Sequence, residues 1–506
     1  MLQLDDFVYD TDALPDGPES PLLYQPGGYH PVTLGNVISS PKTRYHVVHK
    51  LGWGGYATVW LVQDLSSYAW LALRIRMAND GSKGEDEVLR RISSMPHSQH
   101  LPVVHDMFTI EGPNGKHICM ATDVVVPLSE SLLRDSSIRH NAKVIVSGIV
   151  EAVAHIHKAG IIHGDLHMGN VGLAVTLRGD DAHADYPLRC PLEFEPEMTA
   201  VVASTTKALA MSSHLPSYLV SPISIGRDYD LLHDANEPHI VKLFDFGNAH
   251  LEKKPRTTNG FLADIAPPEW AIAQTPEHKP DITLSTASDI WALGILIFEV
   301  MSGGGSIFSR SRGVLPQIAA LAGSIPTSWN AFPAVKYVNV HEISPADSNR
   351  RWEEHRATIR KTGMSDEDAD ALIALLRRIL VLDPTARPNA EEILRDPWFS
   401  IVSQNNEMLD ATPPTVPYTG AVPHHVHLIH SRSHFPQANP YGPPNPCAYP
   451  PPYGAFPAHV QHSQPPLAHT PVYGYPFHFH SASSPVPPLP PPFPMGSGTW
   501  FPPGSR

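Results

Sequence analysis

Cysteine is scarce in this sequence, and a long apolar segment is missing. Three cysteines, Cys119, Cys190 and Cys447, are spread over 506 residues, too few and too scattered for a disulfide framework or a zinc site. This usage indicates a reducing compartment. The acidic N-terminus lacks the apolar run of a signal peptide. The longest strongly apolar stretch, residues 290–300, is too short to span a bilayer and predicts a buried core helix.

A surplus of positive charge is also missing. The chain has 36 lysines and arginines against 50 aspartates and glutamates, which gives a net charge of -14. Such a field argues against direct binding of nucleic acid and is compatible with a basic peptide as partner. Hydrophobic residues make up 42% of the chain, so a sizeable core can form, and the length suffices for two or three domains.

Composition divides the chain into four regions. Residues 1–43 are rich in proline and glycine and predict an irregular N-terminal arm. Strand and helix patterns alternate from residue 44, are interrupted over 176–238, and resume until residue 400. We therefore expect one two-lobed unit over 44–400 that carries an insert. Its small lobe would end near residue 125, and its large lobe would cover 126–400.

The last part of the chain, residues 401–506, differs from the rest. It contains 26 of the 54 prolines, ten histidines and only four charged residues. Such a segment cannot bury enough apolar surface to fold, so we predict a disordered tail. Its run PVPPLPPPFP (485–494) favours polyproline II and is a candidate ligand for a proline-reading domain, although most such runs are plain spacers.

A glycine-rich stretch, HKLGWGGYATVW (49–60), follows an alternating strand pattern. Gly52 and Gly54 allow a tight turn and a close approach of backbone N–H groups to phosphate oxygens. Val59 would then press on an adenine ring, and Leu51 is a further candidate for nucleotide contact. Alone, the pattern is as typical of a simple glycine-rich hairpin as of a nucleotide-binding loop.

The next strand pattern, WLALRIRM, carries Ala72 and Arg74. In a phosphate-clamping fold a lysine is expected at position 74, and arginine keeps the charge on a larger, planar group. The EDEVLRRI pattern that follows predicts a helix with Glu85 on the same face as its apolar residues. We predict Glu85 as the partner of Arg74, with Glu87 as second choice; a solvated acidic helix end is the simpler alternative.

The segment KHICMATDVVVPL (116–128) predicts a strand that leads into a connector. The backbone from Asp123 to Val125 would hydrogen-bond the edge of an adenine ring, with Thr122 lining the pocket behind it. These residues complete a predicted nucleotide site that begins at the glycine-rich stretch.

The strongest pattern is IIHGDLHMGNVGL (161–173), which follows an amphipathic helix pattern that ends at Gly160. His163, Asp165 and Asn170 make the sequence H-x-D-x-x-x-x-N. In such a loop Asp165 orients the attacking hydroxyl or accepts its proton, and Asn170 binds a magnesium ion.

A second motif, D-F-G, follows the strand pattern VKLF and supplies Asp245 as the other predicted metal ligand. Alone it has little weight, but both motifs in order behind the glycine-rich stretch indicate phosphoryl transfer. Further on, Glu269 and Arg387 fit a buried ion pair, and Asp289 fits a helix start that bonds to the backbone of the catalytic loop. Taken singly, these three residues have ordinary interpretations as a turn, a surface arginine and an N-cap.

The region from 44 to 400 resembles a eukaryotic protein kinase, and more closely the serine/arginine-protein kinases that phosphorylate splicing factors, as a divergent, fungal-type member. GGYHPVTLGNV (27–37), with RYHVVHKLGWGGYATVWLVQD after it, matches the beginning of that family, and HICMATDV resembles the approach to its hinge. Asp245 lies 75 positions after Asn170, where that family carries its spacer, so the insert would loop out.

This resemblance implies an α+β, two-lobed protein kinase fold, with a small, mainly antiparallel β lobe that has one key helix and a large, mainly α-helical lobe. It implies ATP and Mg²⁺ as cofactors and an extra helix near 315–321. It also implies a monomer in the cytoplasm and nucleus that acts on a protein substrate, and an Arg/Ser-rich substrate type.

Two positions depart from the family. Arg74 replaces the strand lysine, and His167 stands where most Ser/Thr kinases have a lysine two residues after Asp165. The activation segment (253–269) also lacks the family's usual sequence, and HGDLHMGN is similar to small-molecule phosphotransferases as well. We expect an active Ser/Thr protein kinase in which Asp165, Arg74, Glu85 and His167 serve catalysis. A pseudokinase scaffold with a proline-rich recruitment tail is the main alternative, and a small-molecule phosphotransferase is a more distant one.

Overall fold

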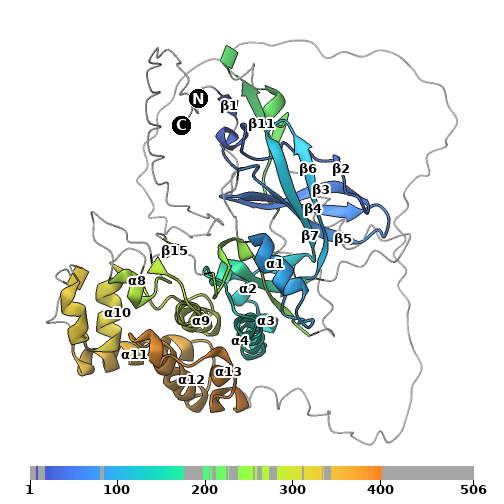
Figure 1. Cartoon of the computed structure of the whole chain (residues 1–506). Helices are drawn as coiled ribbons and strands as arrows, with labels where there is room; N and C mark the ends of the chain where they lie inside the picture. Colours follow the sequence, from blue (N-terminus) through green and yellow to red (C-terminus); the bar gives the residue numbers. More distant parts are fainter. Residues whose placement is uncertain are drawn as a thin grey trace, which may run out of the picture. The chain divides into compact units, whose positions relative to one another are not determined.

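Alternating apolar and polar residues in the first part of the chain form a six-stranded antiparallel sheet, the small lobe, with the strand order β2-β3-β4-β5-β7-β6 (Figure 1). Its strands are β2 (Val37–Ser39), β3 (Arg44–Gly54), β4 (Ala57–Asp64), β5 (Trp70–Arg76), β6 (Val104–Gly112) and β7 (Gly115–Thr122). Residues directly opposite each other share one face, so the register decides which side chains gather on each side.

A computed structural model of the chain underlies this description. The residues that it describes are 7–9, 18–79, 85–175, 198–203, 206–207, 212–223, 226, 229, 238–254, 257–258, 265–272, 282–309, 313–332, 334–335 and 343–401. All of them belong to one compact unit. The predicted tail beyond residue 401, with its polyproline run, lies outside this range.

The two faces of the small-lobe sheet belong to different cores. Leu61 and Ala72, which are paired across β4 and β5, pack in the cluster that also holds the core of the large lobe. The alternate residues Trp60 and Leu73 pack in a separate cluster on the other face. This outer cluster includes Cys119, whose burial raises the pKa of its thiol to about 12. The face that carries Ala72 is therefore the one turned towards the large lobe.

Helix α1 (Glu85–Ser93) is the one long helix beside this sheet in the described part of the chain (Figure 1). Its buried residues Val88 and Leu89 pack in the same cluster as Ala72. The side chain of Glu85 is also turned inwards, with only 1% of its surface exposed. This phase agrees with the prediction from the apolar spacing of the helix.

The predicted N-terminal arm, residues 1–43, contains short regular elements among its turns. β2 pairs with β3 at the edge of the sheet, and β1 (Phe7–Tyr9) pairs with a strand of the insert. Tyr24 and Tyr29 are almost fully buried. Glycine and proline predict an irregular arm here because they mark turns, and short hydrogen-bonded segments between such turns can still pack against the sheet.

The described part of the insert forms strands that pack against the small lobe. β11 (Met198–Ala203) joins β1 to β12 (Tyr218–Val220) in a three-stranded sheet. Val220 packs in the outer cluster of the small lobe, and the Leu34 N–H donates to the Tyr218 hydroxyl over 3.1 Å. The insert therefore returns to the small lobe before the chain reaches the second motif.

The large lobe is built mainly from helices (Figure 1). They are α2 (Glu130–Leu133), α3 (Ser136–His140), α4 (Ala142–Lys158), α8 (Pro268–Ala271), α9 (Thr286–Met301), α10 (Val314–Ala322), α11 (Pro345–Arg360), α12 (Asp366–Ile379) and α13 (Ala390–Leu394). α10 contains the helix predicted near 315–321. Among the helices in the described ranges, none combines the length and the hydrophobicity needed to cross a membrane.

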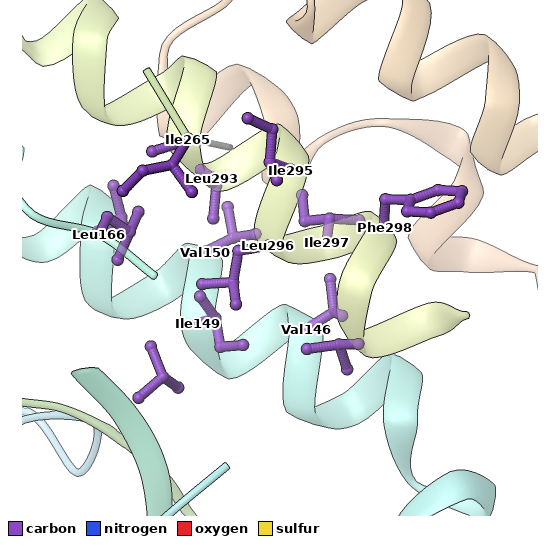
Figure 2. Packing of buried hydrophobic residues seen from close by; sticks show 14 of the residues in the cluster. Val146, Ile149, Val150, Leu166, Ile265, Leu293, Ile295, Leu296, Ile297 and Phe298 are labelled. Atoms are coloured by element: carbon purple, nitrogen blue, oxygen red, sulfur yellow. The ribbon is translucent and has the colours of Figure 1, made fainter. Parts of the chain in front are cut away.

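α9 contains the apolar stretch 290–300 and is buried on almost every side, as predicted. Figure 2 shows Val150 of α4 close to Leu293 and Leu296 of α9. A Cβ on Gly294 would lie 2.6 Å from a carbon of Ile379, so the absence of a side chain allows α12 to approach. α4 ends where Gly160 adopts φ 70°, the left-handed conformation that favours glycine after a helix.

Short strands and single helical turns connect these helices to the sheet. They are β8 (Val125–Pro127), β9 (Ile161–Ile162), η3 (Met168–Asn170), β10 (Val171–Ala174), β13 (Val241–Leu243), η6 (Phe246–Asn248), β14 (His250–Leu251), β15 (Thr257–Thr258) and β16 (Ile282–Thr283). β10 pairs with both β8 and β13, and β9 pairs with β14. These pairings bring the two predicted motifs side by side, although the insert separates them in sequence.

Candidate active site

The glycine-rich stretch forms a hairpin whose turn falls just after Gly52 and Gly54. Gly52 and Gly54 both lie in β3, opposite Val59 and Ala57, and neither has a positive φ. The turn itself is made by residues 55–56. A Cβ on Gly52 would meet nothing within 4 Å, so the missing side chain leaves open space beside the strand. That space suits a ligand that approaches the backbone closely.

One row of residues crosses the sheet from this hairpin. Gly52 lies opposite Val59, Val59 opposite Arg74, and Arg74 opposite Met120. Leu51, Val59 and Met120 are partly buried against the main core cluster, in which Ala72 is a member. The predicted adenine contacts Leu51, Val59 and Ala72 thus lie on the face of the sheet that packs against the main core, the face to which Arg74 also belongs.

Arg74 lies between two acidic side chains. Its guanidinium forms an ion pair with Glu85, and its Nη2 lies 3.6 Å from Oδ1 of Asp245. Glu87, the second choice for this partner, instead forms an exposed ion pair with Lys254 at 2.7 Å. The predicted Arg74–Glu85 contact is therefore confirmed, and the same arginine also reaches the D-F-G motif.

Asp289 binds the backbone of the catalytic loop. Its carboxylate accepts hydrogen bonds from the N–H groups of His163, over 2.7 Å, and Gly164, over 2.9 Å. Burial alone would raise the pKa of Asp289, but hydrogen bonds from His157 and Gly164 outweigh it and lower the pKa below its usual value. The predicted bond between Asp289 and the loop backbone is confirmed.

The loop brings Asp165 and Asn170 together. The Asn170 side-chain amide donates to the Asp165 carbonyl over 2.8 Å. The N–H of Phe244, directly before Asp245, donates to the Asn170 carbonyl over 3.0 Å. The predicted proton acceptor and the two predicted metal ligands therefore share one site.

The oxygen atoms at this site fit a magnesium ion. Asn170 Oδ1 is buried and has no hydrogen-bond partner within the described residues. Leaving a buried amide oxygen unpaired costs free energy, and a hard cation would satisfy it. The carboxylate of Asp245, about one third exposed, is the second oxygen donor nearby.

Asp245 itself has a left-handed backbone, with φ 59°. Its carboxylate accepts from the Gly247 N–H over 3.3 Å. For a residue with a Cβ this conformation costs about 1–2 kcal/mol, and aspartate is one of the few residue types that adopt it. Such conformations concentrate where function requires a particular side-chain direction.

His167 lies close to Asp165 but is not hydrogen-bonded to it. The His167 Nε2 atom is 3.8 Å from Oδ1 of Asp165, while Nδ1 accepts from the Gly169 N–H over 3.0 Å. The imidazole is mostly covered, with 14% of its side chain exposed. His167 therefore lies beside Asp165, and its predicted role in catalysis stays a prediction.

At the predicted adenine-binding connector, the Asp123 side chain is used within the protein. It accepts from the Val103 N–H over 3.0 Å and lies 3.2 Å from the Lys242 ammonium group. Burial alone would raise the pKa of Asp123, but hydrogen bonds from His105 and Val103 and the charge of Lys242 lower it to about 2. Asp123 can therefore meet a nucleotide only through its backbone.

The rest of this connector is also partly engaged. The Val124 carbonyl accepts from the Val175 N–H over 3.3 Å, and Val125 begins β8, opposite Ala174. Thr122 pairs with Ala72 across β7 and β5. The connector thus joins the two lobes through β8 and β10 next to the predicted pocket.

The predicted pair of Glu269 and Arg387 is present. The Arg387 guanidinium donates to both carboxylate oxygens of Glu269, over 2.7 and 3.0 Å, and its side chain is fully buried. Two parallel bonds of this kind fix geometry as well as charge. They attach the end of the activation segment to the segment before α13.

The profile of the family "Protein kinase domain" matches residues 45–178 and 229–399, on both sides of the insert. The chain belongs to the protein kinase family. The fold class predicted from the sequence, with its small β lobe and large helical lobe, is therefore confirmed. The predicted class of enzyme, a protein kinase, is confirmed as well.

The relatives of this kinase are themselves kinases. A "Serine/threonine-protein kinase SRPK" of Physarum polycephalum is 28% identical over 75% of this chain and 90% of its own length. "Protein kinase dsk1" of Schizosaccharomyces pombe is 25% identical over 77% of this chain and 86% of its own. The human "SRSF protein kinase 3" is 34% identical, over 31% of this chain and 30% of its own.

The kinase site also contains residues that the sequence did not indicate. The Asn248 side chain donates to the Asp165 carboxylate over 3.1 Å, and the buried Arg76 lies 3.5 Å from Glu85. Asn248 directly follows the D-F-G motif, a position whose proximity to the catalytic loop only the fold reveals. Arg76 follows Arg74 by two residues on the same strand, so both side chains lie on one face of the sheet. The alternation of side chains along a strand could therefore have indicated Arg76 from the sequence.

Proposed function

We propose that this chain is a catalytically active serine/threonine kinase of Arg/Ser-rich proteins, with Asp165 as the residue that receives the substrate proton. The observation that supports this most is the convergence of Asp165, Asn170, Asp245 and Arg74 on one site. When bound, ATP supplies the transferable phosphoryl group, and Mg²⁺ neutralises its negative charge.

The chain's own residues would position the reactants. Asp165 orients the substrate hydroxyl and accepts its proton, while Asn248 holds one carboxylate oxygen of Asp165 in place. Asn170 and Asp245 are the residues that would hold the metal ion. Arg74, fixed by Glu85, would place a positive charge beside the phosphates of a bound nucleotide.

The substrate type rests on two observations. A human relative carries the name "SRSF protein kinase 3", and the Physarum relative carries the name SRPK. The net charge of -14 also favours a basic substrate over an acidic one.

The full chain should therefore phosphorylate an Arg/Ser-repeat peptide with Mg²⁺-ATP at least about tenfold more efficiently than a Lys/Ser-repeat peptide of equal charge. Arginine presents a planar fork of donors that can bind carboxylates in pairs, whereas lysine is a compact point charge. Initial rates at several peptide concentrations give kcat/KM for each. Equal efficiencies would contradict the Arg/Ser preference but leave the kinase activity intact, and incorporation no higher than that of an Asp165→Ala variant would reject the activity itself.

Arg74 decides between an active enzyme and a pseudokinase scaffold. Arg74→Met should lower kcat/KM about 100-fold, because it removes the charge at the phosphates and releases Glu85. Arg74→Lys should keep activity within about tenfold of the wild type, since the charge remains. Steady-state rates with the peptide substrate measure both.

Arg44→Met is a matched control for this test, because Arg44 lies exposed at the start of β3 in the same sheet. It should leave the rates unchanged. A wild type near zero whose activity rises sharply in Arg74→Lys would instead show that the natural chain is impaired in chemistry, as the scaffold alternative requires.

A further inference from the structure

The segment before the kinase domain packs behind the glycine-rich hairpin. We refer to residues 19–29 as the N-terminal clasp. Glu19 forms an ion pair with Lys50 of β3, and both side chains are almost fully buried. The Lys50 ammonium lies 4.9 Å from the centre of the Trp60 ring, which belongs to the outer cluster. The clasp therefore begins on the face of the sheet opposite the nucleotide row.

The other end of the clasp touches the hairpin itself. The Tyr29 hydroxyl donates to the carbonyl oxygen of Gly54, the last residue of β3 before the turn. The Tyr29 ring is completely buried and packs with Tyr24 and Leu219. A buried aromatic residue with a single polar atom is well suited to fix a backbone group in one direction.

The hairpin is held on its other side by the same assembly. The Met77 N–H donates to the Tyr56 carbonyl over 2.8 Å. The next two N–H groups, of Ala78 and Asn79, donate to the carbonyls of Gly28 and Gly27 over 3.0 and 2.9 Å. The clasp is thus linked to both sides of the turn: directly to Gly54, and to Tyr56 through the segment that begins at Met77.

The clasp is anchored independently of the hairpin. The Gly27 N–H donates to the Asn114 carbonyl over 2.7 Å, and the Asn114 side chain donates to the Tyr29 carbonyl over 2.5 Å. Asn114 lies in the turn between β6 and β7, far from the hairpin in sequence. Tyr29 is therefore held by the turn between β6 and β7, and its hydroxyl links that turn to Gly54.

We infer that Tyr29 is a positioning residue for ATP: its hydroxyl fixes the Gly54–Gly55 peptide group and so holds the hairpin in the form that binds phosphates. Because a trans peptide is planar, a fixed Gly54 carbonyl also fixes the direction of the Gly55 N–H at the tip of the turn. Backbone N–H groups at such a tip are the natural donors to phosphate oxygens. The inference rests on the proposed kinase function.

The test compares Tyr29→Phe with Tyr45→Phe in the full chain. Tyr45 is a matched control because it is also buried in the small lobe, and its hydroxyl donates to Asp106 over 3.1 Å, away from the hairpin. Both variants lose one hydroxyl and keep the ring. In Tyr29→Phe alone, KM for ATP should rise about three- to tenfold, as for the loss of one hydrogen bond. KM for the peptide should not change.

A second measurement does not depend on activity. Hydrogen exchange of the amides in residues 51–60 should be faster in Tyr29→Phe than in the wild type and Tyr45→Phe, which should have the same rates. Equal effects of the two variants on KM for ATP would overturn the inference while the kinase function stands. Faster exchange with an unchanged KM would also overturn it. A wild type without ATP binding would reject the kinase function first.

Discussion

Replacing Asp165 by alanine should lower kcat for peptide phosphorylation by about 10³-fold, the largest effect of any single change in the site. Asp165 is fixed in the loop at two points, since its backbone carbonyl accepts from the Asn170 amide and its carboxylate accepts from the Asn248 side chain. ATP binding should remain close to that of the wild type, because the role proposed for Asp165 is towards the substrate hydroxyl and not the nucleotide. Single-turnover rates and ATP titration separate the two quantities.

Asp370→Ala provides the control for this substitution. Asp370 lies on α12 in an exposed ion pair with Arg356, and such pairs contribute little to stability. Its loss should leave both kcat and ATP affinity unchanged. If Asp165→Ala kept more than a tenth of the wild-type kcat, the proton would have another acceptor, and the role proposed for Asp165 would be wrong.

Glu19→Gln should destabilise the kinase domain by about 3–5 kcal/mol, because it leaves the ammonium group of Lys50 buried without a charged partner. Burial alone lowers the pKa of Lys50, and the charge of Glu19 opposes that effect. The amide of glutamine keeps a hydrogen-bonding atom near Lys50 but removes the negative charge. Urea denaturation followed by tryptophan fluorescence measures the change in the free energy of unfolding.

A double variant tests the physical reason for this loss. Glu19→Leu combined with Lys50→Met removes both buried charges and should recover most of the stability, since apolar side chains of similar size often replace buried ion pairs at little cost. Destabilisation of less than 1 kcal/mol by Glu19→Gln alone would mean that water reaches Lys50, and the clasp would then be loosely attached.

The ion pair that anchors the clasp could not be predicted from the sequence, whereas the catalytic motifs could. Asp165, Asn170 and Asp245 could be predicted because their motifs have fixed spacing around short strands. Glu19 offered no such signal, since it lies 31 positions before its partner Lys50 in a segment rich in proline and glycine. Pairing over that distance is decided by tertiary packing, which local patterns do not report.

The glycines of the hairpin illustrate a second limit. The sequence predicts that Gly52 and Gly54 allow both a tight turn and a close approach to the backbone, whereas residues 55–56 make the turn and Gly52 leaves space beside the strand. Both interpretations need a small residue, so composition alone cannot distinguish them. The Arg74–Glu85 pair, by contrast, followed from helix phase, because α1 has a well-defined apolar face.

The insert leaves the domain after β10 and comes back at β13, and these two strands are direct neighbours. The Ala174 N–H donates to the Ile240 carbonyl over 2.8 Å, so the two ends of the insert meet at its base. Lengthening a loop whose ends are already joined costs little conformational entropy, since that cost grows only with the logarithm of loop length. The two strands that meet at the base can therefore keep their places beside the catalytic loop whatever the length of chain between them.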